Sequence, residues 1–159
     1  MPVSLRPMSE AEIDAWYDAA LESYIASRTR NGEPADVARR VAEQQHADYF
    51  PDRRPAPGHE FLVVEDDGRQ VGMIWTAPHQ RRPDDANVAF LYNIEIDESR
   101  RGRGVGRVAL ALIEARLVAA GVTRIELNVF GGNRRARHIY VSSGYHETSV
   151  QMAKELKVE

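Results

Sequence analysis

Apolar residues recur along the chain with two periods, about 3.6 residues in some segments and 2 in others, and these predict helices and strands respectively. Ser9 and Glu12 form a Ser-x-x-Glu capping box, which marks the start of the first long helix. The segment 66–69 reads Asp-Asp-Gly-Arg between two apolar runs, which indicates a β-hairpin turn. In the segment Arg124–Phe130 apolar and polar residues alternate, as in a half-buried strand.

These signals divide the chain into ten elements. The expected elements are a strand at Val3–Pro7, helices at Ser9–Thr29 and Glu33–Phe50, strands at Glu60–Glu65, Gln70–Thr76 and Asn87–Ile96, a helix from Val105 to Gly121, a strand at Arg124–Phe130, a helix from Arg134 to Gly144 and a last strand at His146–Leu156. A proline-rich loop follows the second helix and is too short to link two domains.

Composition narrows the class of protein. The length of 159 residues predicts one domain, and 43% apolar with 28% charged residues is an ordinary globular balance. A net charge of −3 argues against broad nucleic-acid binding, and the absence of cysteine excludes disulfides and a thiolate nucleophile. The five histidines show no spacing typical of metal ligands, so no metal is expected. No signal-like or membrane-spanning run is present, which predicts a cytoplasmic protein that does not enter a membrane.

The most distinctive segment runs from Asn93 to Gly106, where an apolar strand leads through an arginine- and glycine-rich turn directly into a helix. Such a turn presents unpaired N–H groups at the positive end of a helix dipole, which favours a bound anion. Glycines allow a bulky anion to approach the backbone, and arginines add charge-assisted hydrogen bonds to phosphate oxygens. The segment therefore predicts a diphosphate site.

Two common phosphate motifs fit this turn poorly. A P-loop requires Gly-Lys-Ser/Thr, which the turn lacks. The stretch Gly104–Ala109 does match the Gly-x-Gly-x-x-Gly/Ala pattern of dinucleotide-binding folds. However, a long basic loop precedes it, and the next strand ends without an acidic residue. The dinucleotide interpretation is therefore the weaker one.

The stretch Arg101–Gly106 resembles the Gln/Arg-x-x-Gly-x-Gly/Ala signature of the GNAT superfamily of N-acetyltransferases, where it holds the pyrophosphate of acetyl-coenzyme A. The stretch Asn133–Tyr145 is similar to the second family signature, Asn-x-x-Ala-x-x-x-Tyr followed by Gly-Phe/Tyr. The resemblance implies an acyltransferase that moves an acetyl group from acetyl-CoA to a primary amine of a small molecule or peptide. The transfer would be direct, within a ternary complex.

The resemblance also implies a fold, because the order of the expected elements is the one found in GNAT proteins. We expect an α/β (α+β) architecture with one mixed, mostly antiparallel sheet and helices on both faces. A single acetyltransferase domain would span residues 1–159.

Acetyl transfer requires proximity of the two reactants, a proton donor for the departing thiolate and a route for the proton of the amine. By the resemblance, Tyr140 stands where GNAT enzymes carry the tyrosine that can protonate the coenzyme A sulfur; the alternative is an aromatic side chain that only packs on the sheet. Asn133 is expected to contact the cofactor, to cap a helix, or both. Asn128 occupies a position where some members carry a glutamate base, and its amide could only hold a water molecule or the acceptor.

Glu95 interrupts an apolar strand between Ile94 and Ile96, where an unpaired charge is costly. Three interpretations remain open: a base that acts directly or through water, an anchor for the amine, and an ion pair with a nearby arginine. Strand alternation places Glu95 on the face opposite to Ile94 and Ile96, but the pattern does not say which face meets the substrate.

The resemblance assigns the remaining cofactor contacts to the strand and the turn. The backbone groups of Ile94 and Ile96 are expected to bind the pantetheine amides. The residues expected at the phosphates or the sulfur are Arg101, Gly102, Arg103, Gly104, Val105, Gly106, Arg107, Asn133 and Tyr140. Arg100 is expected to be a solvated charge.

The acceptor is less defined. By the resemblance, the segments that wall the acceptor site of GNAT proteins here contain Arg28 and Arg30 and the aromatic residues Trp16, Tyr17, Tyr24, Trp75 and Tyr92, most of which are expected to be core. With Arg81 and Arg82 in another loop, the two arginines favour an acceptor that also carries a carboxylate or phosphate. Two other functions remain as alternatives: a non-catalytic acyl-CoA sensor, and a nucleic-acid binder that uses the local arginines. No nucleic-acid partner is expected, and a homodimer is left open.

Overall fold

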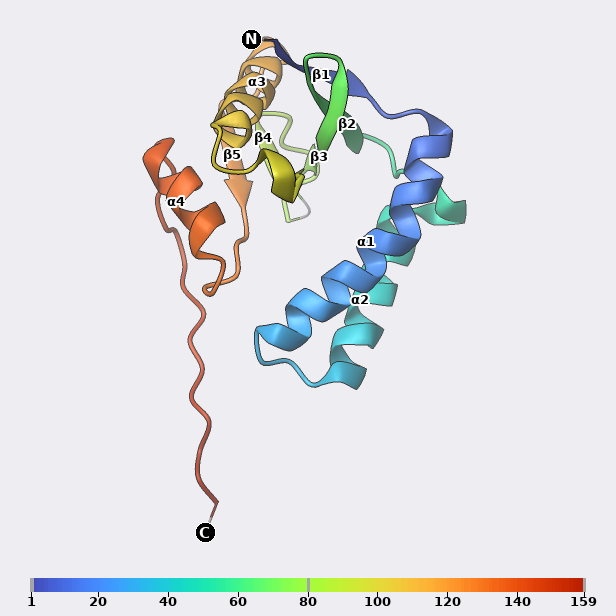
Figure 1. Ribbon diagram of the computed structural model, residues 1–159. Helices are drawn as coiled ribbons and strands as arrows, with labels where there is room; N and C mark the ends of the chain where they lie inside the picture. Colours follow the sequence, from blue (N-terminus) through green and yellow to red (C-terminus); the bar gives the residue numbers. More distant parts are fainter. Residues whose placement is uncertain (1, 80, 159) are drawn as a thin grey trace.

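The computed structural model describes residues 2–79 and 81–158, and in them one five-stranded sheet has the order β1-β2-β3-β4-β5 (Figure 1). Strands β1, β2 and β3 each pair antiparallel with the strand that follows, and β5 pairs parallel with β4. The strands are β1 (Val3–Pro7), β2 (Glu60–Asp66), β3 (Arg69–Pro78), β4 (Val88–Ile96) and β5 (Arg124–Leu127), and the helices are α1 (Glu10–Arg30), α2 (Ala35–Tyr49), α3 (Val105–Ala119) and α4 (Arg134–Ser142). Two short 3₁₀ helices, Pro51–Arg53 and Glu98–Arg100, were not predicted.

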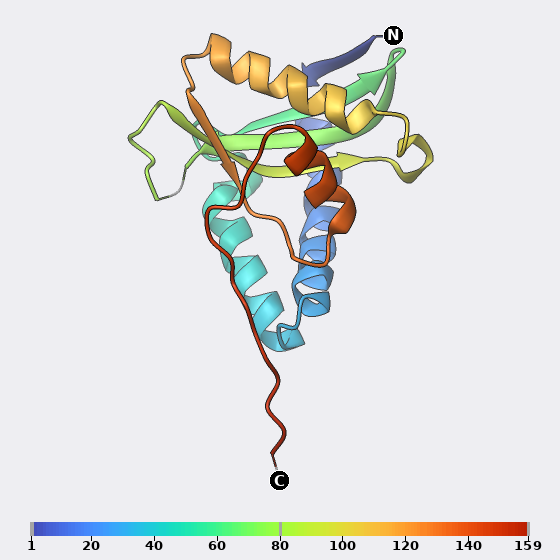
Figure 2. The same cartoon turned by 90° about the vertical axis from the view of Figure 1, so that its left-hand side faces the viewer.

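Helices cover both faces of the sheet, as Figure 2 shows for α3 on one side and the α1–α2 pair on the other. Neighbouring strand residues point to opposite faces, so each strand contributes to two cores. Leu62 and Ile74 pack with Ile113 of α3, while Phe61 and Trp75 pack in a separate aromatic cluster with residues of α1 and the end of α2. The predicted mixed, mostly antiparallel sheet with helices on both faces is confirmed.

Local signals in the sequence placed several boundaries correctly. The Ser9 hydroxyl accepts a hydrogen bond from the Glu12 N–H at 3.2 Å, and the Glu12 carboxylate accepts one from the Ser9 N–H at 2.8 Å. The β2–β3 turn has positive φ at Asp67 (53°) and Gly68 (75°), as a two-residue type I′ hairpin requires. Both features depend only on residues a few positions apart.

The sheet opens between β4 and β5, and this opening positions the site described below. A bulge in β4 leaves Tyr92 without a partner on β3, because Trp75 pairs with Asn93 and Thr76 with Leu91. β5 pairs only with residues 88–91 of β4 and ends at Leu127, so the predicted strand to Phe130 is too long. Beyond Leu91 the two strands diverge.

The predicted last strand, His146–Leu156, is wrong for this structure. The segment is extended but pairs with no strand in the described ranges, and it leaves the body of the molecule in both views (Figures 1 and 2). The sequence shows the period-2 pattern of a strand, but a strand also needs a neighbour for its backbone hydrogen bonds. Its apolar side chains, Val150, Met152 and Leu156 among them, are exposed.

Candidate active site

The glycine-rich turn between β4 and α3 adopts a backbone that suits glycine. Gly102 and Gly104 have φ of 77° and 80°, in the left-handed region, and Gly104 is the N-cap residue of α3. The N–H of Val108 bonds to the carbonyl of Gly104 at 3.1 Å. Because a helical N–H bonds to the carbonyl four residues earlier, the N–H groups of residues 105–107 have no acceptor within α3 itself. They lie at the positive end of the helix dipole.

Three elements converge at Gly106, in the first turn of α3. A Cβ atom built at Gly106 would lie 3.5 Å from Cδ1 of Ile139 in α4 and 3.7 Å from Cγ1 of Ile96 at the end of β4. Both are ordinary van der Waals distances. The start of α3, the end of β4 and the middle of α4 thus surround one short stretch of backbone, and a methyl group at Gly106 fits there at ordinary contact distances.

The end of β4 presents a free backbone edge beside this turn. The N–H of Asp97 donates to the carbonyl of Val71 in β3 at 2.8 Å, so alternation directs the backbone groups of Ile94 and Ile96 away from β3. Within residues 2–79 and 81–158 no strand lies on that side, because β5 has already diverged. The Arg101 guanidinium uses part of this edge, since its Nε donates to the carbonyl of Ile96 at 2.9 Å.

The arginines of the turn differ in what they contact. The Arg107 Nη2 lies 3.3 Å from Nε2 of His138, and this nitrogen must accept because a guanidinium only donates. Arg100 was expected to be a solvated charge, but it forms an ion pair with the buried Asp66 at 3.5 Å. Arg103 is exposed and makes no hydrogen bond or ion pair within residues 2–79 and 81–158, so its charge is free for a ligand.

Tyr140 lies in α4 and is half-buried against the core on the α3 face. Its ring centroid lies 5.6 Å from that of Tyr145. Burial raises the pKa of the Tyr140 hydroxyl to about 12, and this hydroxyl has no hydrogen-bond partner in the described part of the chain. Tyr140 therefore packs on the core and also keeps a proton that can be donated at neutral pH.

The two asparagines occupy different settings. Asn133 is the N-cap residue of α4, and its side-chain oxygen accepts a hydrogen bond from the N–H of Ala136 at 3.2 Å. Its predicted capping role is confirmed, and its amide nitrogen still has its two hydrogens to donate. Asn128 is exposed directly after β5, where the strands have separated.

Glu95 faces the α1–α2 side of the sheet, because Ile94 and Ile96 pack into the core on the α3 side. Its carboxylate is exposed and accepts a hydrogen bond from the side-chain amide of Asn93 at 2.9 Å. Among the residues described, no arginine pairs with Glu95, so the ion-pair interpretation is wrong. The carboxylate remains available to a proton or an amine.

Comparison with known proteins shows to which family the chain belongs. The model of the acetyltransferase (GNAT) family matches residues 13–145. The chain belongs to this family. Its relatives include the uncharacterized N-acetyltransferase YdgE of Bacillus subtilis, which is 27% identical over 98% of this chain and 99% of YdgE. A mycothiol acetyltransferase of Sanguibacter keddieii is 32% identical over 96% of this chain, which spans 47% of that protein.

The three-dimensional comparison agrees with the family. The crystal structure of YycN from Bacillus subtilis matches this GNAT protein with a TM-score of 0.88 and 26% identity, over 99% of this chain and 100% of YycN. YycN, like YdgE, is described as an uncharacterized N-acetyltransferase. Family membership and these relatives make the protein an acetyl-CoA-dependent acyltransferase.

An aromatic cluster lies on the same side of the sheet as Glu95, and it includes Trp75 and Tyr92, which were expected near the acceptor site. The ring of Tyr92 stacks on that of Trp75 at a centroid distance of 4.7 Å, and His59 stacks on Tyr92 at 5.7 Å. The Trp75 Nε1 donates to Nδ1 of His59 at 3.0 Å, and burial lowers the pKa of this histidine. Burial and a hydrogen bond to Tyr49 raise the pKa of the Tyr92 hydroxyl above its ordinary value.

No single sequence pattern could have revealed this cluster. Tyr49 and His59 flank the proline-rich loop, whereas Trp75 and Tyr92 belong to two different strands. Within its own segment, each of these four residues has the pattern of an ordinary core or loop residue. Only the pairing of β3 with β4 and the packing of the end of α2 bring the four rings together.

Two of the four arginines expected to favour an acceptor with a carboxylate or phosphate are ion-paired within the protein. The Arg28 Nη2 donates to the Glu33 carboxylate at 3.0 Å, and Arg82 pairs with Glu126. Arg30 is exposed and bonds to the hydroxyl of Ser27 at 3.1 Å.

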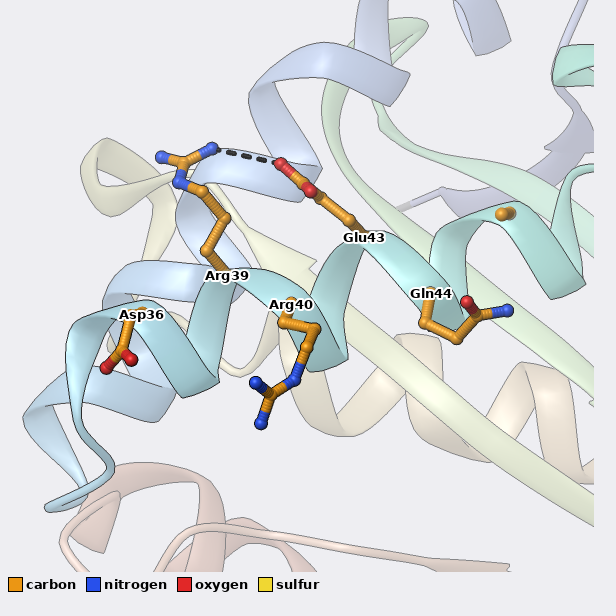
Figure 3. Close-up of a pocket in the computed structure, with 6 residues that line it drawn as sticks. Asp36, Arg39, Arg40, Glu43 and Gln44 are labelled. Carbon is orange, nitrogen blue, oxygen red and sulfur yellow. Dashed lines mark hydrogen bonds and ion pairs between the residues drawn. The ribbon is translucent and has the colours of Figure 1, made fainter.

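A surface pocket occurs elsewhere, on the outer side of α2 (Figure 3). Its lining residues are Asp36, Arg39, Arg40, Glu43, Gln44 and Ala47. All of them belong to one helix, and the Arg39 guanidinium already forms ion pairs with Glu43, at 3.4 Å, and with Glu22. The pocket lies outside the convergence of β4, α3 and α4, so it does not enter the acetyl-transfer site.

In the described residues, no group of three or more His, Asp or Glu side chains is arranged to hold a metal ion. None of the helices in the described ranges has the length and apolar character needed to cross a bilayer.

Proposed function

We propose that this GNAT protein transfers an acetyl group from acetyl-CoA to a primary amine of a small molecule or peptide, by direct transfer in a ternary complex. Residues 1–159 would act as one acetyltransferase domain. One observation carries the proposal: the free backbone edge of β4 ends at the N–H groups of the α3 start, and Ile139 in α4 packs there next to Tyr140. This arrangement offers a diphosphate site, an amide-binding edge and a proton donor in one place.

In this proposal the turn and its flanking residues hold coenzyme A. The N–H groups of residues 102–106 and the side chains of Arg103 and Arg107 bind the diphosphate, with Arg101 bracing the end of β4. The backbone edge at Ile94 and Ile96 binds the pantetheine amides, as an added strand would. The side-chain amide nitrogen of Asn133 contributes a further donor.

In this proposal the protein's residues only position the two reactants and transfer protons. The thioester supplies the acetyl group, and the neutral amine forms the new C–N bond as the C–S bond breaks. Tyr140 donates its proton to the departing sulfur, and its raised pKa keeps that proton in place until then. The amine loses one proton in exchange, so the reaction is balanced.

Glu95 is the candidate acceptor for the proton of the amine, and Asn128 is a candidate for holding a water molecule. Glu95 lies on the α1–α2 side with an exposed carboxylate oriented by Asn93, which suits a base that acts directly or through water. Asn128 lies where β5 leaves β4, and its amide can hold a water molecule but cannot take a proton. We assign Glu95 the base role and Asn128 the positioning role.

The decisive experiment measures thiol release from acetyl-CoA with a panel of primary amines. Tyr140→Phe is expected to lower kcat by about 10²- to 10⁴-fold, with the affinity for coenzyme A unchanged by calorimetry. Tyr145→Phe is the matched control, because that neighbouring hydroxyl is occupied by Glu114 at 2.9 Å. Equal kcat in the two variants would remove Tyr140 from proton transfer.

Glu95→Gln separates the two proton routes. If Glu95 is the base, the variant loses activity at neutral pH and regains part of it as rising pH deprotonates the amine in solution. Unchanged activity at every pH would exclude Glu95. Coenzyme A binding without transfer to any amine of the panel would instead favour the non-catalytic sensor.

Coenzyme A binding is tested by Arg103→Ala. The control is Arg69→Ala, because Arg69 is also exposed but lies at the β2–β3 turn. Loss of one charge-assisted hydrogen bond is worth about 1.5–3 kcal/mol, so coenzyme A should bind roughly 10- to 100-fold more weakly to Arg103→Ala only. If neither variant nor the wild-type protein binds coenzyme A at this turn, the proposed function is wrong.

A further inference from the structure

The turn that precedes α3 has little packing around it. Arg100 alone among residues 97–104 is part-buried, and the others are exposed. A Cβ atom built at Gly102 or Gly104 would meet nothing within 4 Å, so no neighbouring element holds the middle of the turn. A turn that binds a diphosphate through its N–H groups must nevertheless keep these groups in fixed directions. Contacts at the start of the turn therefore have to fix its geometry.

Two interactions join the start of this turn to the β2–β3 hairpin. The N–H of Asp97 donates to the carbonyl of Val71 at 2.8 Å, and the Arg100 guanidinium pairs with the Asp66 carboxylate at 3.5 Å. Figure 2 shows the hairpin and the turn at the same end of the sheet. Among the described residues, no other side chain of 97–104 forms a hydrogen bond or ion pair with the hairpin. Arg100 is thus the side-chain anchor of the turn on this hairpin.

Asp66 lies where a carboxylate needs such a partner. It ends β2, opposite Val3 of β1 and Arg69 of β3, and only 8% of its surface is exposed. It points to the α3 face, because its partner Val3 packs into the core on that face. A carboxylate buried there without a cation is costly, and in the described part of the chain Arg100 is the cation that pairs with it. The ion pair therefore ties a buried point of the sheet to the turn.

We propose that Asp66 is a positioning residue for the acetyl-CoA site, because its ion pair with Arg100 holds the turn so that the N–H groups of residues 102–106 converge on the diphosphate. The inference rests on the proposed function, since that function assigns the turn to coenzyme A. The Arg100 side chain is directed to the sheet, so its charge orients the backbone of the turn. Asp66 acts on the cofactor only through Arg100.

The sign of the effect of Asp66→Asn separates this role from two others. The substitution keeps the shape of the side chain and removes its negative charge. If Arg100 were a phosphate ligand that Asp66 holds back, its release would strengthen coenzyme A binding. Loss of an acidic charge near an anion site would also strengthen binding, by Coulomb's law. Loss of a positioning contact weakens it instead.

The first test combines calorimetric titration of coenzyme A with steady-state kinetics, under conditions where urea unfolding shows each variant to be fully folded. For Asp66→Asn we expect Kd, and KM for acetyl-CoA, to rise about tenfold, which corresponds to about 1.4 kcal/mol, with kcat at saturation within about twofold. A role in stability alone would leave the Kd of the folded protein unchanged. Unchanged or tighter binding by Asp66→Asn overturns the proposal.

Asp67→Asn is the matched control for this test. Asp67 carries the same charge on the next residue, but it is exposed and forms no ion pair in the described ranges. Its φ of 53° is one that asparagine tolerates, so the substitution keeps the turn. We expect Asp67→Asn to bind coenzyme A like the wild-type protein. A tenfold loss in this control as well would mean that the charge of the hairpin, and not the ion pair, is responsible.

The second test asks whether the two side chains act as one unit. Arg100→Gln should also weaken coenzyme A binding about tenfold. The double variant Asp66→Asn/Arg100→Gln should bind no more weakly than either single variant, because both substitutions remove the same interaction. Additive losses, about 100-fold in the double variant, would show that the side chains act separately and would overturn the proposal.

The third test needs no coenzyme. The N–H groups of Asp97, Arg100 and Arg101 are hydrogen-bonded in the turn or to β3. Their amide hydrogen exchange should become about tenfold faster in Asp66→Asn but not in Asp67→Asn, with exchange in α2 unchanged in both. Unchanged exchange in Asp66→Asn overturns the inference even if the wild-type protein binds coenzyme A. If the turn loosens as expected but the wild-type protein binds no coenzyme A, the proposed function is wrong, whereas the hold of the ion pair on the turn is confirmed.

Discussion

Replacing Gly72 with alanine tests how closely β3 must approach the end of β4 that forms the candidate site. A Cβ atom at Gly72 would lie 2.1 Å from the carbonyl oxygen of Glu95 and 3.0 Å from Cδ1 of Ile96. A carbon and a carbonyl oxygen normally stay roughly 3.3 Å apart. The two strands would therefore have to separate by about 1 Å at this point.

The expected cost follows from what this separation breaks. Gly72 pairs with Ile96, and the neighbouring N–H of Asp97 bonds to Val71 at 2.8 Å. Weakening two such hydrogen bonds costs about 1 kcal/mol each, and strain in a packed interior adds about 1–3 kcal/mol. The sum, about 3 to 5 kcal/mol, is a large part of a typical stability of about 5–15 kcal/mol. At about 2–4 °C per kcal/mol, Tm should fall by roughly 6–20 °C.

The assay combines urea unfolding with calorimetric titration of coenzyme A. Gly131→Ala is the control, because its Cβ would meet nothing within 4 Å and its φ is not positive. Its free energy of unfolding should change by less than about 0.5 kcal/mol. Gly72→Ala should also weaken coenzyme A binding, since the edge at Ile96 moves. If Gly72→Ala unfolds and binds like the control, the close approach of β3 does not position β4.

Three smaller predictions concern the surroundings of the site. Gly104→Ala forces a φ of 80° on a residue with a Cβ and should cost about 1–2 kcal/mol of unfolding free energy. In Gly106→Ala the added methyl group fits, so the unfolding free energy should change by less than about 0.5 kcal/mol, and equal losses in the two variants would contradict this. Burial lowers the pKa of His46, so below pH ~6.5 the unfolded chain binds more protons than the folded one. The free energy of unfolding, measured with urea, should therefore fall from pH ~6.5 toward pH ~5, and it should fall less steeply in His46→Phe. Parallel pH profiles of the two proteins would count against this prediction. Tyr145→Phe removes the hydrogen bond to Glu114 and should cost about 1–2 kcal/mol by thermal unfolding, a loss that Glu114→Gln should only partly reproduce.

The chain's own sequence determined the local structure and the family. The capping box at Ser9, the hairpin turn at Asp67 and Gly68, and the glycine turn before α3 depend on residues within a few positions of one another. Such features are decided by backbone dihedrals and by short-range hydrogen bonds, so each is readable from a short stretch. The two signatures that indicated a GNAT protein are local in the same sense.

Tertiary structure decided the features that depend on segments far apart in the sequence. The face of Glu95 and its contact with Asn93, the ion pair of Arg100 with Asp66, and the early end of β5 all follow from how strands pair and helices pack. The alternation at 146–156 predicts a strand, but an extended segment becomes a strand only beside a partner edge, and in the described residues this segment has none. That partner is outside the reach of any local pattern, because hydrogen bonds between strands join residues that the sequence does not place together.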